Sequence, residues 1–143
     1  MSYLEAGIII VAKYFILIPI LFTIFWFIKY SKDRKKLVIL MLATGVLSLL
    51  IATLAGSLYN NARPFISDNI TPLFPHATDN GFPSSHTLLV ATISAVLFFF
   101  SRKLSYASWI ITLLVGFARV AAGIHHTIDI IGSIIISIIS VLI

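Results

Sequence analysis

The chain is a succession of long apolar runs separated by short polar segments. The apolar runs occupy residues 6–28, 37–58, 87–100, 106–122 and 127–143. As helices, the first two would extend about 33 Å, which suffices for a hydrocarbon core about 30 Å thick. The third run is shorter and needs its polar flanks to reach across. Because backbone groups in hydrocarbon must satisfy one another, the runs predict helices despite their many β-branched residues.

This pattern predicts an all-α integral membrane protein, a bundle of about five transmembrane helices. The composition agrees, because 59% of the residues are hydrophobic and only 10% are charged, against about 25% charged in a soluble domain. We expect a single membrane-embedded domain over residues 1–143. The first run lacks a preceding basic region and is too long for a signal peptide, so we expect a retained membrane anchor. The chain has no cysteine, which excludes disulfides and thiolate metal ligands.

The distribution of charge predicts the orientation. Seven of the ten basic residues lie in two loops that are separated by two spans and therefore share a side. The positive-inside rule places these loops on the cytoplasmic side of the cell membrane. The N-terminus, the loop at residues 59–85 and the junction at 123–127 then lie on the outer face, together with all four histidines. Because the basic residues are grouped in this way, nucleic acid is not an expected partner.

Ionisable residues interrupt the apolar sequence near its end, where such groups are costly and usually functional. His125 and Asp129 are four residues apart, one helical turn, so their side chains are predicted to meet. A carboxylate that accepts one imidazole N–H leaves the other ring nitrogen free as a nucleophile or base. The alternative is that the pair caps a helix near the membrane interface. The neighbouring His126 is expected to be an interfacial residue.

A second and a third polar patch lie upstream. Ser84 and Ser85 stand where a helix is expected to begin, and its free N–H groups and positive dipole end attract anions. His86 follows as a possible proton donor. Arg63 and Arg119 add guanidinium groups, which match phosphate oxygens and stay charged. Each feature has a structural alternative: a helix cap, a turn or a headgroup anchor. Since all of them fall on one face, they predict a phosphate-handling site.

The same residues resemble the three-part signature of the type 2 phosphatidic acid phosphatase superfamily. The matching segments are Arg63-Pro64, then Pro83-Ser84-Ser85-His86, then Arg119 followed by His125 and Asp129. They cover residues 60–129, about half of the chain. Within this stretch, Arg63-Pro64-Phe65, Phe74-Pro75-His76-Ala77 and residues 79–86 look most like the bacitracin-resistance type of undecaprenyl-diphosphate phosphatase.

The resemblance implies a metal-independent lipid phosphatase that needs no cofactor. It would hydrolyse undecaprenyl diphosphate to undecaprenyl phosphate, which recycles the carrier lipid of cell-wall synthesis. His125 would form a phosphohistidine, oriented by Asp129, and His86 would protonate the leaving group. The implied partners are the lipid phosphate substrate and the membrane lipids. The phosphate oxygens would be held by Arg63, Arg119, Ser84 and Ser85.

Three positions depart from the signature. Gly56 stands where the first motif usually has a lysine, Ser85 where the second usually has glycine, and Ala118 where serine commonly precedes the arginine. One phosphate-binding cation is therefore missing or supplied from elsewhere. Many members also have six spans, whereas this sequence has five and ends within an apolar run. It is either a minimal member or a shortened one.

Several alternatives stay open at this point. His76 and Asp79 lie between the first two motifs, where they could contact a second phosphate or hold the loop in shape. The same mechanism would serve phosphatidic acid, phosphatidylglycerol phosphate or lipid A. A different class is a transport protein, in which a His/Asp cluster relays protons or binds zinc through His76, His86, His125 and Asp129. The last alternative is a folded but inactive relative.

Overall fold

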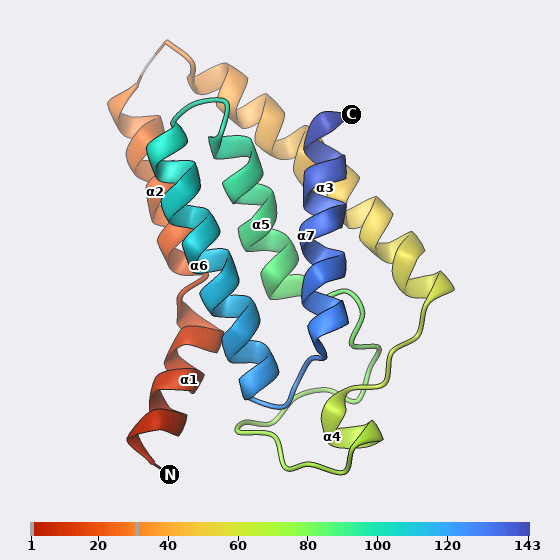
Figure 1. Cartoon of the computed structure of the whole chain (residues 1–143). Coiled ribbons are helices and arrows are strands. Elements are labelled where there is room, and N and C mark those ends of the chain that lie inside the picture. The colour runs from red at the N-terminus through yellow and green to blue at the C-terminus, as the bar shows by residue number, and fades with distance from the viewer. Residues whose placement is uncertain (1, 31) are drawn as a thin grey trace.

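The computed structural model describes residues 2–30 and 32–143, and Figure 1 shows the course of the chain. Within these residues the regular elements are all helices, as the apolar runs predicted. In chain order they are α1 (Tyr3–Tyr14), α2 (Leu17–Lys29), α3 (Arg34–Leu58), α4 (Pro64–Ser67), α5 (Ser85–Leu97), α6 (Arg102–Ala121) and α7 (Thr127–Leu142).

The first apolar run is not one straight helix but two, and α1 and α2 meet at an angle of 42°. In a continuous helix the ring of Pro19 would collide with the carbonyl group of Phe15, four residues earlier. The break at Phe15 and Ile16 removes this clash. Pro19 then occupies the first turn of α2, where a missing N–H costs little. The break lies beside the polar end of the bundle, and the site described below makes use of it.

The number of membrane spans stays a prediction. By length and hydropathy α3 and α6 can each cross a membrane, and the bent pair of α1 and α2 can form a third span. The helices α5 and α7 are apolar but have only 13 and 16 residues, about 20 and 24 Å. The central helix α5 packs against α2, α3, α6 and α7. Because protein surrounds α5, it does not have to match the bilayer by itself.

Small hydroxyl residues join α5 to its neighbours inside the bundle. The hydroxyl oxygens of Ser94 and Thr112 lie 3.1 Å apart between α5 and α6. On the other side, Ser133 and Ser137 of α7 donate to backbone carbonyl groups of α5 and its N-cap residue. Side chains of this size let helices approach closely and form hydrogen bonds where water is absent. They fix α7, and with it Asp129, against the start of α5.

The connecting segments fall at two opposite ends of the bundle. One end carries the α2–α3 and α5–α6 connections and the C-terminus (Figure 1). The other end carries the N-terminus, the long segment that includes α4, and the α6–α7 junction. The seven clustered basic residues lie at the first end, and the three polar patches meet at the second. The arrangement of the loops that the charge pattern predicted is confirmed, whereas the side of the membrane on which each end lies stays a prediction.

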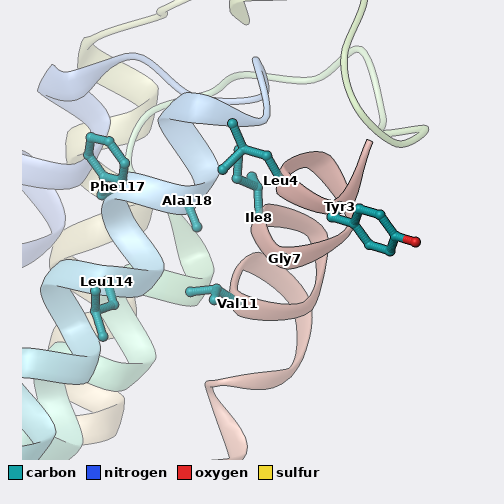
Figure 2. Close-up of a pocket in the computed structure, with 8 residues that line it drawn as sticks. All are labelled: Tyr3, Leu4, Gly7, Ile8, Val11, Leu114, Phe117 and Ala118. Atoms are coloured by element: carbon teal, nitrogen blue, oxygen red, sulfur yellow. The ribbon is translucent and has the colours of Figure 1, made fainter. Parts of the chain in front are cut away.

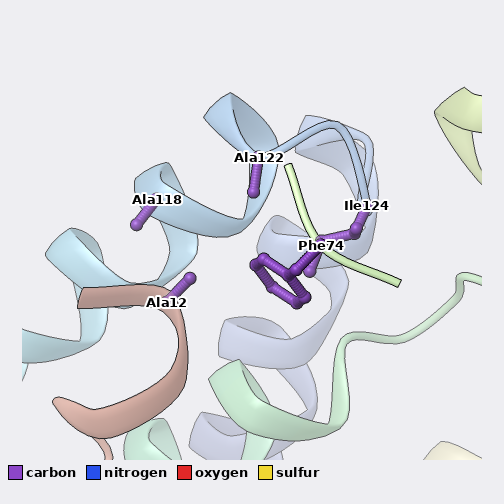
Figure 3. Packing of buried hydrophobic residues seen from close by; sticks show 5 residues of the cluster. All are labelled: Ala12, Phe74, Ala118, Ala122 and Ile124. Atoms are coloured by element: carbon purple, nitrogen blue, oxygen red, sulfur yellow. The ribbon is translucent and has the colours of Figure 1, made fainter. Parts of the chain in front are cut away.

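An apolar cluster attaches the long segment to the helices at the polar end. Its buried members are Ala12, Phe74, Ala118, Ala122 and Ile124. Figure 3 shows Phe74 beside Ile124, with Ala12 of α1 close to Ala118 of α6. The backbone N–H of Leu73 also donates to the carbonyl oxygen of Ala122, at 3.0 Å. The segment is therefore held against α1 and α6 at the end of the bundle where the polar residues lie.

A groove between α1 and α6 opens on the outside of the bundle (Figure 2). Its volume is about 280 Å³, and none of its lining residues is charged. The groove is lined on the α1 side by Tyr3, Leu4, Gly7, Ile8 and Val11, and on the α6 side by Leu114, Phe117 and Ala118. The groove is thus an apolar surface beside the polar end, and the ionisable cluster lies elsewhere.

Candidate active site

His125 and Asp129 form the centre of a buried polar cluster. The His125 side chain is 1% exposed and Asp129 is fully buried. The Nδ1 atom of His125 lies 3.2 Å from Oδ2 of Asp129. The predicted contact is confirmed, but its geometry differs from the expectation. His125 precedes α7 instead of lying on it, because the helix begins at Thr127.

Asp129 is held by two further hydrogen bonds. Its Oδ2 atom accepts the backbone N–H of His126, at 2.9 Å, in a capping box at the start of α7. Its Oδ1 atom accepts from Nδ2 of Asn61, at 2.8 Å. A carboxylate with this many donors is fixed in orientation and stays ionised. The two interpretations of the pair, a helix cap and a functional contact, therefore do not exclude each other. The same carboxylate caps α7 and orients His125.

Arg63 reaches this pair from the segment before α4. Its side chain is buried, and Nη1 donates to the carbonyl oxygen of Ile124 at 2.9 Å. The same Nη1 lies 3.2 Å from Nε2 of His125. On its other side, Arg63 Nε donates to Oδ1 of Asp79 at 2.9 Å, and Nη2 lies 2.9 Å from the same oxygen in an ion pair. Asp79 is a surface residue, and it holds the guanidinium in place.

Arg119 approaches His125 from the opposite direction, in the last turn of α6. Its Nη1 donates to the carbonyl oxygen of Ala12 at 3.3 Å, and Nη2 lies 3.4 Å from Nε2 of His125. This arginine is 1% exposed, and no carboxylate pairs with it in the described part of the chain. Its Nε has no hydrogen-bond partner there either. A buried guanidinium without a counterion is a strong attractor for an anion.

These contacts determine which nitrogen of His125 carries the proton. A guanidinium group can only donate hydrogen bonds. The Nε2 atom, which faces Arg63 and Arg119, must therefore act as the acceptor, and Nδ1 donates to Asp129. The Nε2 lone pair of His125 thus points to the place where two cations converge. Burial is the main cause that lowers the pKa of His125, and the two arginines add to it against the opposing effect of Asp129. The ring is therefore neutral and nucleophilic at neutral pH.

The start of α5 supplies the second predicted patch. Ser84 is the N-cap residue of this helix, as expected. Its backbone N–H is already bound to the carbonyl oxygen of Asp129 at 3.2 Å, and its hydroxyl accepts from Thr87. The N–H groups of the first turn of α5 remain available to an anion. Ser85 is exposed and lines a groove between α3 and α5. The backbone N–H groups that the start of α5 can offer are therefore those of Ser85 and the residues after it, whereas the N–H of Ser84 is already bound.

His86 lies on the side of α5 that faces the cluster. Arg119, His125 and His76 lie near enough for their charges to influence its ring. No hydrogen bond to its ring is present among residues 2–30 and 32–143. The ring is thus close to the other histidines and unattached, as a proton donor for a departing group would have to be.

His76 and Asp79 both contact the arginines. His76 Nε2 accepts from Nη2 of Arg119 at 3.1 Å, and its ring meets the His125 ring edge to face. Burial, followed by the charges of Arg63 and Arg119, lowers the pKa of His76 from its ordinary value of 6.5. Burial alone would raise the pKa of Asp79, but the hydrogen bond and charge of Arg63 hold this pKa below its usual range. These contacts favour a role in holding the arginines, one of the two alternatives left by the sequence.

Position 56, where the related signature has a lysine, is closed off in this chain. A side chain at Gly56 would come within 3.0 Å of the carbonyl oxygen of Phe82. The Asn80 side chain donates to the Gly56 carbonyl oxygen at 2.9 Å and to that of Tyr59 at 3.0 Å. The loop therefore packs directly against the backbone of α3, and position 56 supplies no cation to the site.

Three contributors were missed by the sequence reasoning. Asn61 binds Asp129, the Ala12 carbonyl group binds Arg119, and Gly81 allows close packing. A side chain at Gly81 would come 3.1 Å from Oδ2 of Asp129 and 3.0 Å from the Asn61 carbonyl oxygen. Nothing in the sequence marks a backbone carbonyl group as a ligand. The proximity of Asn61 and Gly81 to the recognised motifs was the only available indication.

The alternative of a zinc site finds little support in this geometry. Within the described residues, no group of three or more His, Asp or Glu side chains is arranged to hold a metal ion. The free nitrogens of His76 and His125 instead face guanidinium groups. Two fixed positive charges beside these nitrogens would repel a metal cation and attract an anion.

Comparison with known proteins agrees with the family resemblance of the sequence motifs. The family model described as PAP2 superfamily matches residues 36–143. Undecaprenyl-diphosphatase BcrC of Bacillus subtilis (strain 168) is 33% identical over 139 residues, which cover 96% of this chain and 72% of the relative. A Bacillus licheniformis protein named bacitracin transport permease protein BcrC is 29% identical over 120 residues, 83% of this chain and 59% of that relative. Among solved structures, LpxE of Aquifex aeolicus superposes with a TM-score of 0.72 at 26% identity, covering 99% of this chain and 85% of that one.

Proposed function

The chain belongs to the PAP2 superfamily, and from this premise we propose that it is a membrane lipid phosphatase that hydrolyses undecaprenyl diphosphate to undecaprenyl phosphate. The observation that carries the proposal is the position of His125 Nε2. It lies 3.2 Å from Arg63 Nη1 and 3.4 Å from Arg119 Nη2, while Nδ1 contacts Asp129. A nucleophile and two phosphate-binding cations thus meet at one point, and that point is buried.

In the first step, the lone pair of His125 Nε2 attacks the terminal phosphorus and forms an N–P bond. The bond between this phosphorus and the bridging oxygen breaks, and the lipid monophosphate leaves with a proton from His86. The Nδ1–H of His125 stays bound to Asp129, which stabilises the positive charge that develops on the ring. Arg63, Arg119 and the N–H groups at the start of α5 hold the three phosphoryl oxygens.

In the second step, water attacks the phosphorus of the phosphohistidine. His86, now neutral, takes the proton from this water, and the N–P bond breaks. Inorganic phosphate leaves and His125 returns to its starting tautomer. Each residue acts through a group that it already presents in the unliganded cluster, and no step calls for a metal ion or a cofactor.

The choice of lipid follows the relatives. The Bacillus subtilis relative, which matches almost the full length of this chain, is named an undecaprenyl-diphosphatase, and so is a Sulfolobus acidocaldarius protein at 31% identity. Phosphatidic acid, phosphatidylglycerol phosphate and lipid A keep the same mechanism and are the alternative substrates. The name of the Bacillus licheniformis relative raises transport as a different class of function. A buried nucleophile oriented by a carboxylate favours hydrolysis over transport.

We further propose that the site faces the outer side of the cell membrane. The seven clustered basic residues lie at the opposite end of the bundle, and such residues are retained in the cytoplasm. This orientation suits a carrier lipid that is released as a diphosphate outside the cell. The apolar surfaces of the helices would contact the membrane lipids.

The test is phosphate release by the detergent-purified protein in EDTA, with undecaprenyl diphosphate and phosphatidic acid as substrates and His125→Ala as the control. Release from the diphosphate that disappears in the variant is the expected result. Release from phosphatidic acid alone would change the substrate and keep the mechanism. Activity that EDTA abolishes would contradict metal independence. No release above the level of the variant on either lipid would contradict the phosphatase function.

A further inference from the structure

We propose that Lys13 binds the second phosphate of a diphosphate substrate, next to the terminal phosphate that reacts at His125. Lys13 would then be the residue that distinguishes lipid diphosphates from lipid monophosphates. The inference rests on the proposed function and extends it to a residue outside the sequence motifs.

The distribution of basic residues singles out Lys13. Of the ten lysines and arginines, seven lie at the far end of the bundle. Two of the remaining three, Arg63 and Arg119, are already committed to the terminal phosphate. Lys13 is the third, and the other lysines of the sequence all belong to the cluster at the far end of the bundle. It lies within an otherwise apolar run, where a charged side chain requires compensation.

The break between α1 and α2 brings Lys13 to the site. In a continuous helix the N–H of Ile16 would bind the carbonyl oxygen of Ala12, but this bond is absent among the described residues. Arg119 Nη1 binds that oxygen instead, at 3.3 Å. Lys13 is the next residue along the chain and stands in the last turn of α1. The positive end of its side chain is favoured there by the helix dipole.

The side chain of Lys13 extends over the loop that carries His76. Its Nζ lies 4.4 Å from the centre of the Phe74 ring, a cation–π contact. Phe74 is buried between α1, α6 and the α6–α7 junction (Figure 3). Two residues further on, His76 accepts a hydrogen bond from Arg119. Lys13 therefore lies against the segment that presents His76 to Arg119.

Lys13 is free to bind an anion. It forms no ion pair with a carboxylate in the described part of the chain, and its side chain is exposed. A lysine side chain has a flexible four-carbon stem and three donors, so Nζ can leave the Phe74 ring for a phosphate oxygen. A diphosphate carries more negative charge than a monophosphate, and a third cation next to Arg119 supplies the matching positive charge.

The experiment compares two lipids that share the same acyl chains, diacylglycerol diphosphate and phosphatidic acid. The kcat/KM for phosphate release is measured for both with the full chain in detergent micelles. In Lys13→Met, which keeps the length of the stem, the ratio of diphosphate to monophosphate kcat/KM should fall about 10- to 100-fold, the effect of losing a charged hydrogen bond. Lys13→Arg should restore most of the ratio.

Lys29→Met is the matched control. Lys29 stands in the last turn of α2, at the far end of the same helix pair, and its Nζ lies 5.5 Å from the Phe25 ring and 5.6 Å from the Tyr30 ring. It thus shares the cation–π environment of Lys13 without the site. An unchanged ratio in Lys13→Met overturns the proposal, whether or not both rates fall together, because a membrane anchor would affect the two lipids equally.

A binding measurement separates this proposal from the phosphatase function. Inorganic diphosphate should raise the melting temperature of the wild-type protein more than inorganic phosphate does, and Lys13→Met or Lys13→Gln should remove the difference. If the wild type hydrolyses neither lipid, the proposed function fails and this measurement decides the role of Lys13. Equal stabilisation by the two anions in the wild type would overturn the assignment.

Discussion

Nδ1 of His125 lies 3.2 Å from Oδ2 of Asp129 across the first residues of α7, and the same oxygen accepts the backbone N–H of His126. One carboxylate oxygen thus caps a helix and fixes the tautomer of the proposed nucleophile. Because the cap holds Asp129 in place before any substrate binds, His125 is oriented in the resting protein. Such orientation in advance lowers the cost of reaching the transition state.

Replacing Asp129 with asparagine should inactivate the site while keeping its shape. An amide group can donate to His125 Nδ1, which would move the ring proton to Nε2 and remove the attacking lone pair. We expect kcat to fall about 10³- to 10⁴-fold, the scale known for such a change of tautomer in other enzymes. Phosphate release measures the loss. A variant that retains more than a tenth of the activity would show that Asp129 serves only as a helix cap.

Asn61 should support catalysis through Asp129. Its Nδ2 donates to Oδ1 of the carboxylate at 2.8 Å, and Asn61→Ala removes this bond. A hydrogen bond to a charged group contributes about 1.5 to 3 kcal/mol, so kcat should fall by at least roughly tenfold with KM little changed. The adjacent Asn60→Ala is the control, because no side-chain hydrogen bond of Asn60 occurs in the described residues. Equal losses in both variants would contradict the assignment.

Gly81 should not tolerate a side chain. The added methyl group of Gly81→Ala would lie 3.1 Å from Asp129 Oδ2 and 3.0 Å from the Asn61 carbonyl oxygen. The neighbours must shift, so we expect lower kcat and a lower melting temperature. Gly45→Ala is the matched control, because a methyl group there meets nothing within 4 Å. Because Gly45 lies in the interior of α3, this change should leave the free energy of unfolding unchanged or raise it by up to about 1 kcal/mol. Similar behaviour of the two variants would refute the packing argument.

The protein should lose stability in mild acid. The pKa values of His76 and His125 are lowered in the folded state, chiefly by burial, so the unfolded chain binds protons more readily. The stability that the two neutral histidines contribute is fully present above pH 6.5, the pKa of histidine in the unfolded chain. It falls as the pH drops through 6.5 towards the pKa values of the folded protein. Melting temperatures between pH 8 and pH 5 measure the effect, and His76→Gln should reduce the slope. A melting temperature that is constant or rises over this range would contradict the prediction.

The orientation in the membrane can be tested by labelling, because the chain contains no cysteine. Thr71 lies in the exposed part of the long segment at the polar end, and Lys103 is an exposed residue in the first turn of α6, beside the α5–α6 connection; each is replaced with cysteine. In intact cells, a membrane-impermeant maleimide should label the first variant, whereas the second should react only after lysis. The opposite pattern would place the site in the cytoplasm.

The sequence predicted the helices well because long apolar runs leave the backbone no other way to satisfy its hydrogen bonds in a membrane. The ends of α3, α5, α6 and α7 lie within a few residues of the predicted runs. The prediction of one straight first helix was wrong, although Pro19 was visible in the sequence. A proline within an apolar run indicates a possible kink, but whether the helix bends or breaks depends on what receives the released carbonyl group. Here the Phe15 carbonyl group accepts the N–H of Ile18, and the break leaves the Ala12 carbonyl group to Arg119.

The sequence by itself determined the class of protein and the order of the helices. It also singled out His125, Asp129, Arg63 and Arg119 as candidate site residues, since ionisable groups in apolar runs are rare enough to stand out. Only the tertiary structure decided how they meet. It placed Nε2 of His125 between two guanidinium groups, paired Asp79 with Arg63 and His76 with Arg119, and brought the carbonyl group of Ala12 to Arg119. These contacts join residues up to 107 positions apart. Local patterns carry no information about such distances, because helix packing alone sets which ends of the chain come together.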